Sequence, residues 1–231
     1  MARSGLWVVM PVKDLPDAKQ RLAAVLDARE RQELFRAMVE DVLSALAASA
    51  GLAGILLVTR DPQARHLATR YGARVLVEDE NRGHTAASSL GARTLAQEGV
   101  PGMVQLPADI PLVTPEDIAA LLYVHGEAPA VTLAPSRDEQ GSNAVACSPP
   151  DLLPLRFGDD SFFPHLQRAR ALGVEAQIVK RPGLALDVDT ADDLVAFLAA
   201  PSETRAYAYL AESGIVERIK ARAADSWLAS E

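Results

Sequence analysis

The sequence predicts an α/β fold, a three-layer Rossmann-type sandwich whose sheet is mixed but mostly parallel, and three observations support this. Short apolar runs alternate with helical patterns from residue 6 to about residue 199. Capping residues, prolines and glycines mark helix starts and stops between those runs. Two extended segments within 129–148 follow each other without a helix between them. The alternation favours parallel strands covered by helices on both faces. The two consecutive extended segments interrupt it and predict an inserted ribbon.

The first half of the chain alternates strand and helix three times. Residues 28–49 carry apolar side chains at three- and four-residue spacing, the pattern of a helix with one buried face. The following helix is well delimited, because Asp61 can cap its start, Pro62 suits its first position and Gly72 can end it. In chain order we predict a strand at 6–12, a helix at 28–49, a strand at 53–59, a helix at 61–72, a strand at 73–79 and a helix at 84–98.

The second half continues the alternation and interrupts it once. Thr114, Pro115 and Glu116 form a helix start signal after the fourth strand. The segments PAVTLAP and NAVACS both look extended and are joined by a polar loop at 136–142. In chain order we predict a strand at 102–109, a helix at 114–124, extended segments at 129–135 and 143–148, a helix at 160–172, a strand at 175–179 and a helix at 190–199.

We expect one catalytic domain over residues 1–200 and a helical extension over residues 201–231. The extension is rich in alanine, glutamate and arginine, which favour helix, and Gly214 interrupts it. Its apolar side chains could pack on the core or on a dimer partner. The predicted docking face consists of Tyr209, Leu210, Ile215, Ile219 and Trp227.

Composition argues against nucleic-acid and membrane partners. The chain has 231 residues and a formal net charge of −8, and no basic stretch exceeds a few residues. The amino-terminal apolar run is too short for a signal peptide, and no run of about 18 apolar residues could span a membrane. The single cysteine, Cys147, excludes an internal disulfide and a cysteine-rich zinc site. We therefore expect a cytoplasmic protein.

Acidic residues follow two predicted strands, where a parallel sheet presents its ligand crevice. Asp109 comes after VQLPA, and Asp187 and Asp189 lie in LALDVDTADDL. The period-two spacing of the pair places both carboxylates on one side of an extended segment, where they could share a divalent ion. Two alternatives remain open. Asp109 could cap the segment after it, and Asp189 could cap the next helix together with Thr190 and Asp192.

Cations follow the end of the first strand at Pro11 and Val12. Lys13, Lys19 and Arg21 lie close together there and could hold the phosphates of a nucleoside triphosphate, although any one of them could be an ordinary surface residue. The sequence contains no G-x-x-x-x-G-K-[ST] and no G-x-G-x-x-G motif. Neither a P-loop kinase nor a dinucleotide fold is therefore supported.

Two further loops have the composition of anion-binding loops. EQGSNAV offers a glycine followed by Ser142 and Asn143, and RFGDDSFFPHL offers Gly158 and Ser161 before a helix. Either loop could be no more than a turn or a helix cap. His165 could face the same site, although a lone helical histidine is more often a packed or surface residue.

Several of these segments together resemble the phospholactate guanylyltransferase family of deazaflavin coenzyme F420 biosynthesis, in the same order from about residue 6 to 199. The resemblance implies a nucleotide-diphospho-sugar-transferase-like nucleotidyltransferase fold. It also implies transfer of GMP from GTP to phospholactate, phosphoenolpyruvate or 3-phosphoglycerate, with release of pyrophosphate. The segments are PVKDLPDAKQRL, ERQELFRAMVEDVLSAL, LPADIPLV, GSNAV, FGDDSFFPHLQRA and LALDVDTADDL.

The resemblance also implies roles for individual residues. The catalytic residues are Lys13, Lys19 and Asp109, and the Mg²⁺ ligands are Asp109, Asp187 and Asp189. The nucleotide-binding residues are Pro11, Val12, Lys13, Lys19, Arg21, Gly83 and Asp109. The acceptor-binding residues are Ser142, Asn143, Gly158 and Ser161. The family usually has Gly-Thr-Asn where this chain has Gly-Ser-Asn at 141–143, and Gly-Leu-Asn where it has Gly-His-Thr at 83–85. The second departure leaves the base preference and the acceptor open.

We expect direct in-line attack by the acceptor's phosphate oxygen on the α-phosphorus of GTP, without a covalent nucleophile. The expected partners are GTP and the acid, with a homodimer as a further option and a downstream deazaflavin transferase as recipient of the product. Three alternatives stay open: nucleotidyl transfer to a sugar phosphate or to molybdopterin, a non-catalytic nucleotide sensor, and a structural interaction protein.

Overall fold

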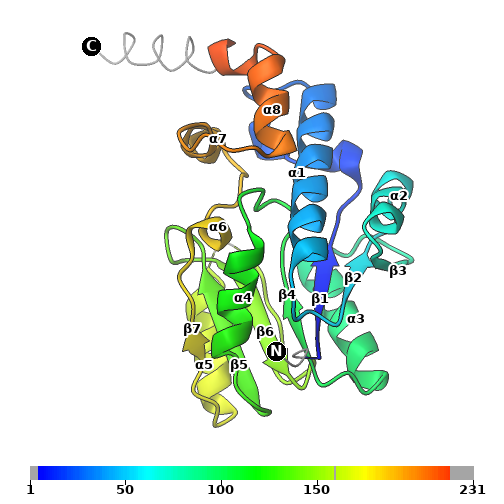
Figure 1. Cartoon of the computed structure of the whole chain (residues 1–231), viewed down its shortest axis with the longest axis vertical. Coiled ribbons are helices and arrows are strands. Elements are labelled where there is room, and N and C mark those ends of the chain that lie inside the picture. Colours follow the sequence, from blue (N-terminus) through cyan, green and yellow to red (C-terminus); the bar gives the residue numbers. More distant parts are fainter. Residues whose placement is uncertain (1–4, 159, 219–231) are drawn as a thin grey trace.

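The computed structural model describes residues 5–158 and 160–218 and confirms the α/β fold (Figure 1). Its seven-stranded sheet has the order β3-β2-β1-β4-β6-β5-β7. β1, β2, β3 and β4 run parallel, and β6 lies antiparallel between β4 and β5, so the predicted ribbon makes the sheet mixed. The strands are β1 (Leu6–Pro11), β2 (Gly54–Val58), β3 (Arg74–Leu76), β4 (Gly102–Gln105), β5 (Ala130–Pro135), β6 (Ser142–Ser148) and β7 (Gln177–Ile178).

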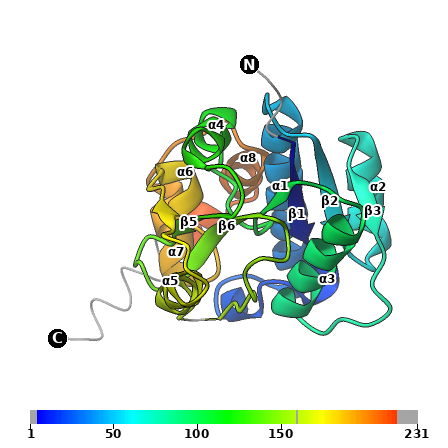
Figure 2. The same cartoon turned by 90° about the horizontal axis from the view of Figure 1, so that it is seen from below.

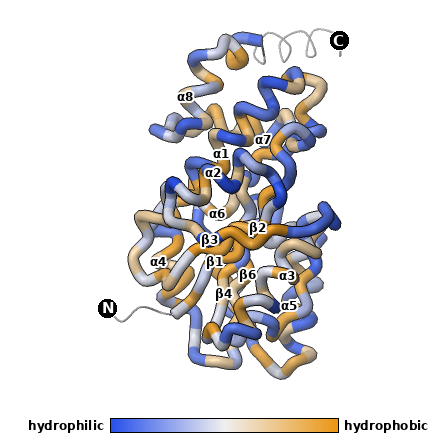
Figure 3. Tube along the Cα trace, turned by 90° about the vertical axis from the view of Figure 1, so that its right-hand side faces the viewer, coloured by the Kyte–Doolittle hydropathy of each residue, from blue (hydrophilic) through white to orange (hydrophobic). Residues whose placement is uncertain are grey.

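Helices cover both faces of the sheet (Figure 2). One face carries α1 (Ala28–Ala48), α2 (Pro62–Arg70) and α4 (Pro115–Val124), and the other carries α3 (His84–Gln97) and α5 (Phe162–Ala171). Each face has its own apolar core, and the strands between them are the most hydrophobic part of the molecule (Figure 3). The remaining helices are α6 (Pro182–Ala185), α7 (Ala191–Leu198) and α8 (Arg205–Glu212).

The predicted helix starts at Asp61 and Thr114 are confirmed. The carboxylate of Asp61 accepts the backbone N–H groups of Gln63 and Ala64, with Pro62 in the first turn of α2. Thr114 and Asp117 form a reciprocal capping box at the start of α4. These local bonds satisfy donors that a helix leaves unpaired at its first turn.

Three short elements were not predicted. Two 3₁₀ turns, Leu15–Asp17 and Gln20–Leu22, occupy the segment after β1, and α6 precedes the second acidic segment. The predicted strand 102–109 is also shorter, because β4 ends at Gln105 and Pro107 has no N–H to continue a ladder. Beyond that point, Asp109 accepts a backbone hydrogen bond from Val188 at 3.0 Å, which brings the two acidic segments side by side.

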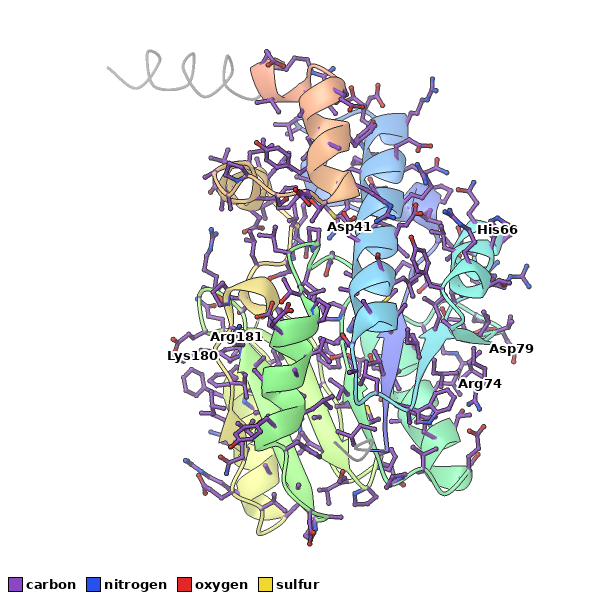
Figure 4. The ribbon with its side chains drawn as sticks, viewed as in Figure 1. Asp41, His66, Arg74, Asp79, Lys180 and Arg181 are labelled. Atoms are coloured by element: carbon purple, nitrogen blue, oxygen red, sulfur yellow. The ribbon has the colours of Figure 1, made fainter. Side chains whose placement is uncertain are left out.

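The extension predicted after residue 200 lies against the main core, where α8 runs alongside α1 (Figure 1). Leu210 and Ile215 are fully buried in that core. Asp41 of α1 accepts the backbone N–H groups of Arg205 at 2.8 Å and Ala206 at 2.9 Å, and Figure 4 shows it between the two helices. Ile219 and Trp227 of the predicted docking face lie outside the described residues.

Within 5–158 and 160–218, we find no helix that combines the length and the apolar character needed to cross a membrane.

Candidate active site

A cleft of about 880 Å³ opens where β1 and β4 end. β1 and β4 are parallel neighbours, so the segments that follow them emerge at one edge of the sheet. Every predicted site residue except Val12 lines the cleft. The side chain of Val12 lies in the core, and its backbone N–H donates to Val58 at 2.9 Å. The lining residues predicted from sequence are Pro11, Lys13, Lys19, Arg21, Gly83, Asp109, Ser142, Asn143, Gly158, Ser161, Asp187 and Asp189.

Lys19 joins two of the acidic residues. Its Nζ donates to Oδ2 of Asp109 at 2.6 Å and to Oδ1 of Asp189 at 2.7 Å. The side chain is only 3% exposed, and Nζ also lies 5.6 Å from the ring centre of Phe35. Burial alone would lower the pKa of Lys19, but the charges of Asp109 and Asp189 outweigh it and raise the pKa. Lys19 therefore stays a cation inside the cleft.

The backbone at Lys19 is left-handed, with φ 56° and ψ 39°. This conformation costs a non-glycine residue on the order of 1–2 kcal/mol. It occurs between the two 3₁₀ turns and turns the ammonium group inward. Strain of this kind is often found at functional sites.

The carboxylates of the cleft are not fully paired. Oδ1 of Asp109 is buried and has no hydrogen-bond partner among the described residues. Asp187 accepts a hydrogen bond from Nδ2 of Asn143 at 3.1 Å. Burial, followed by the charge of Asp109, raises the pKa of Asp187 to about 6. Two crowded carboxylates of this kind suit a further cation.

The alternative in which Asp189 caps the next helix does not hold. Thr190 caps α7, and Asp193 completes the capping box with it. Burial would raise the pKa of Asp189, but the nearby Lys19 ammonium lowers it below its usual value. The carboxylate of Asp189 therefore belongs to the cleft.

A complete metal site is not preassembled. In the part of the chain that the structure describes, no group of three or more His, Cys, Asp or Glu side chains stands close enough to hold a metal ion. The ammonium of Lys19 bridges Asp109 and Asp189 instead. The unpaired Oδ1 of Asp109 and the raised pKa of Asp187 nevertheless fit a hard divalent cation.

The predicted acceptor residues line the cleft from distinct elements. Ser142 begins β6 and Ser161 precedes α5, and the backbone N–H of Ser142 donates to Oγ of Ser161 at 2.8 Å. Asn143 faces the other way. Its amide donates to the carbonyls of Leu184 and Ala185 and to Asp187, so it orients the second acidic segment.

No role was predicted for His84, Thr85 and Phe157, which connect the start of α3 to the loop before α5. Oγ1 of Thr85 accepts the backbone N–H of Phe157 at 2.9 Å. The ring of His84 meets Phe157 edge-on at 4.8 Å, and burial lowers the pKa of His84 to about 4. The departure from the family pattern at 83–85 was the only sequence signal for this connection.

Further cations line the cleft beside the predicted ones. Arg82 and Arg137 line it together with the exposed Lys13 and Arg21. Local positive charge of this kind allows a chain of net charge −8 to accept a polyanion.

Comparison with known proteins gives a family match and similar folds. A family model described as guanylyl transferase CofC like matches residues 6–226, beyond the limit of about 199 seen in the sequence. The phosphoenolpyruvate guanylyltransferase of Rubrobacter xylanophilus is 42% identical over 189 residues, which cover 82% of this chain and 91% of that protein. The 3-phospho-D-glycerate guanylyltransferase of Colwellia psychrerythraea is 34% identical over 196 residues, or 84% of this chain and 92% of that protein.

Solved structures share the fold. A Desulfovibrio desulfuricans protein assigned to the nucleotide-diphospho-sugar transferases has a TM-score of 0.76 at 18% identity, covering 95% of this chain and 98% of that one. A nucleotidyl transferase from Methanothermobacter has a TM-score of 0.62 at 18% identity, covering 83% and 95%. These likenesses confirm the predicted nucleotidyltransferase-type fold.

Proposed function

Because the chain belongs to the family of CofC-like guanylyl transferases, we propose that it transfers GMP from GTP to a small phosphorylated three-carbon acid in coenzyme F420 biosynthesis. Phosphoenolpyruvate is the first candidate acceptor, because a relative named for that substrate is 42% identical. 3-Phosphoglycerate and 2-phospholactate are the next candidates.

One observation carries the proposal. A single cleft collects Lys13, Lys19, Asp109, Asp187 and Asp189 from three distant segments. Cations, crowded carboxylates and hydroxyl groups thus face one space large enough for a nucleotide and a small acid. A structural interaction protein has no need for a buried carboxylate oxygen without a partner, such as Oδ1 of Asp109.

The reaction follows from the charges of the two substrates. The acceptor's ionised phosphate oxygen attacks the α-phosphorus of GTP, the bond between that phosphorus and the bridging oxygen breaks, and pyrophosphate leaves with the electron pair. No covalent nucleophile is needed, so positioning and charge neutralisation account for catalysis. Lys13, Lys19 and Arg21 are proposed to hold the β- and γ-phosphates, and Ser142, Gly158 and Ser161 the acid.

The carboxylates are proposed to hold a divalent cation. Asp109, Asp187 and Asp189 would bind Mg²⁺, which would neutralise phosphate charge when bound. Oxygen ligands beside a triphosphate are the environment that Mg²⁺ prefers.

We also propose that the enzyme acts in the cytoplasm and passes its product to a downstream deazaflavin transferase. A homodimer is proposed only as an option, and gel filtration with light scattering tests it.

A substrate matrix tests the activity. GTP, CTP and ATP are each combined with phosphoenolpyruvate, 3-phosphoglycerate, 2-phospholactate and a sugar phosphate, and pyrophosphate release is followed with Mg²⁺ present. We expect release with GTP and a three-carbon acid, and mass spectrometry should find the diphosphate-linked product. Release with the sugar phosphate alone, or none above the Asp109→Asn control, would reject the proposal.

A further inference from the structure

His165 lies behind the cleft wall and does not line the cleft. It is fully buried in α5, one turn after Ser161. Nδ1 lies 3.0 Å from Oγ of Ser142, and Nε2 lies 3.1 Å from the backbone nitrogen of Arg156. The imidazole therefore connects a residue of the cleft wall with the backbone of the neighbouring loop.

The second contact fixes where the proton of His165 resides. A backbone N–H can only donate, so Nε2 accepts from Arg156 and carries no hydrogen. A neutral imidazole then has its one hydrogen on Nδ1. Burial, with a smaller contribution from the charge of Arg168, lowers the pKa of His165 to about 4, so the ring is neutral near pH 7.

This tautomer determines the direction of the hydrogen bond to Ser142. Nδ1–H donates, and Oγ of Ser142 accepts. The hydroxyl hydrogen of Ser142 then has no acceptor among the described residues. The hydroxyl of Ser161 is in the same state, because its Oγ accepts the backbone N–H of Ser142.

We propose that His165 is a positioning residue that makes the hydroxyl of Ser142 a donor to the acid substrate. With Ser161, it presents two neutral O–H donors to a phosphate or carboxylate. Anions are well bound by preorganised donors. The inference rests on the proposed function, since the acid is the acceptor of the guanylyl group.

Two substitutions separate the two nitrogens of the ring. In His165→Asn an amide nitrogen stands near the position of Nδ1 and can still donate to Ser142. In His165→Gln the amide reaches the position of Nε2, and the donor to Ser142 is lost. We expect His165→Gln to raise KM for the acid about tenfold, the effect of one ordinary hydrogen bond, with KM for GTP unchanged. We expect His165→Asn to stay within about threefold of the wild type.

His125 provides a matched control. It is also a histidine between two hydroxyls, Thr132 at 2.9 Å and Ser148 at 3.0 Å, and neither it nor they line the cleft. His125→Gln should leave KM for the acid unchanged. Equal effects of the Asn and Gln variants of His165, or an equal rise in both KM values, would show a packing role and overturn the inference.

A double-mutant cycle gives a sharper test. Ser142→Ala removes the hydroxyl that His165 orients, so His165→Gln should add no further loss in that background. Additive losses would contradict the inference.

The tautomer can also be read directly in the wild-type protein by nitrogen-15 NMR. A hydrogen on Nε2 would refute the inference even if every variant failed to fold.

Calorimetric binding of phosphoenolpyruvate separates the proposed guanylyl transfer from the proposed role of His165. Wild-type protein that binds the acid but transfers no guanylyl group would reject the proposed function alone, whereas active wild-type protein with an unaffected His165→Gln variant would reject only the role of His165.

Discussion

The carboxylates at the junction of α1 with α8 are buried and those of the cleft are half-buried, and the two regions pair them differently. At the junction, Asp41 accepts two backbone N–H groups of α8. Beside it, Glu40 accepts a hydrogen bond from Tyr71 at 3.1 Å and forms an ion pair with Arg70 at 3.1 Å. In the cleft, Asp109 keeps a buried oxygen without a partner within the described residues, and Asp187 has a raised pKa.

The difference distinguishes carboxylates that stabilise the fold from carboxylates that can bind a ligand. A buried polar atom without a partner costs about 1–3 kcal/mol, so such atoms are rare unless they serve a function. At the junction, the carboxylate of Asp41 joins two helices by hydrogen bonds. The cleft leaves part of its carboxylate surface available, and we therefore expect mutations in the two regions to affect different properties.

Asp109→Asn gives the largest expected effect. Turnover should fall about a thousandfold or more, because several kcal/mol of charge stabilisation are lost. The thermal midpoint should stay close to the wild-type value, since the amide oxygen can still accept from Lys19. Steady-state kinetics and calorimetry measure the two quantities. Near-normal turnover of Asp109→Asn would show that the carboxylates of the cleft are no more important for catalysis than those of the junction.

Acidification should lower the free energy of unfolding, because His165 is buried in its neutral form. The unfolded histidine takes up its proton near pH 6.5 and the folded one only near pH 4, so stability is complete above pH 6.5 and is lost as the pH falls towards 4. The loss should reach about 2.5 kcal/mol at pH 4.5. Urea unfolding of wild type and His165→Asn at pH 7 and 4.5 measures this loss of stability. Groups that titrate in both proteins, such as Asp187, contribute equally and cancel in the comparison. An equal loss in both proteins would contradict this prediction.

Asp41→Ala should damage stability and leave the chemistry intact. Loss of the two hydrogen bonds to the first turn of α8 should lower the free energy of unfolding by about 2 kcal/mol. Turnover at 25 °C should match the wild type, because Asp41 does not line the cleft. A turnover loss in fully folded protein would mean that α1 carries an effect from the junction to Phe35 in the cleft.

Glu139→Gln should have the smallest effect. Glu139 pairs with Lys180, and both side chains are more than half exposed; Lys180 lies at the outer edge in Figure 4. Exposed pairs of this kind contribute below about 1 kcal/mol. A larger change in the free energy of unfolding by urea would show that this exposed ion pair stabilises the protein more than we infer.

The regular elements could be predicted because each carries a repeating signal. The apolar stripe predicted a helix at 28–49, and the structure has Ala28–Ala48. The 3₁₀ turns around Lys19 and the four-residue α6 escaped prediction, because a single turn shows no period.

The site could be predicted in outline for a topological reason. The parallel strands β1 and β4 bring their carboxyl ends to one edge, which placed the early lysines and Asp109 in one cleft. The prediction that Asp187 also follows a strand was wrong, because this residue comes after α6 and its segment reaches the cleft beside Asp109 through the backbone bond of Val188. The sequence could not single out Lys19 among the cations, because its inward direction depends on a left-handed backbone. It could not assign His165 either, because the contact with Ser142 depends on where the antiparallel β6 meets α5.

The contact of Asp41 with the first turn of α8 has a consequence for biosynthesis. Asp41 is translated early, and its partners Arg205 and Ala206 leave the ribosome more than 160 residues later. Until then the nascent chain holds a carboxylate without its final partners and an apolar flank of α1 open to water. A premature stop codon before residue 205 would therefore spare every residue of the cleft and still leave Asp41 and that flank of α1 without their partners.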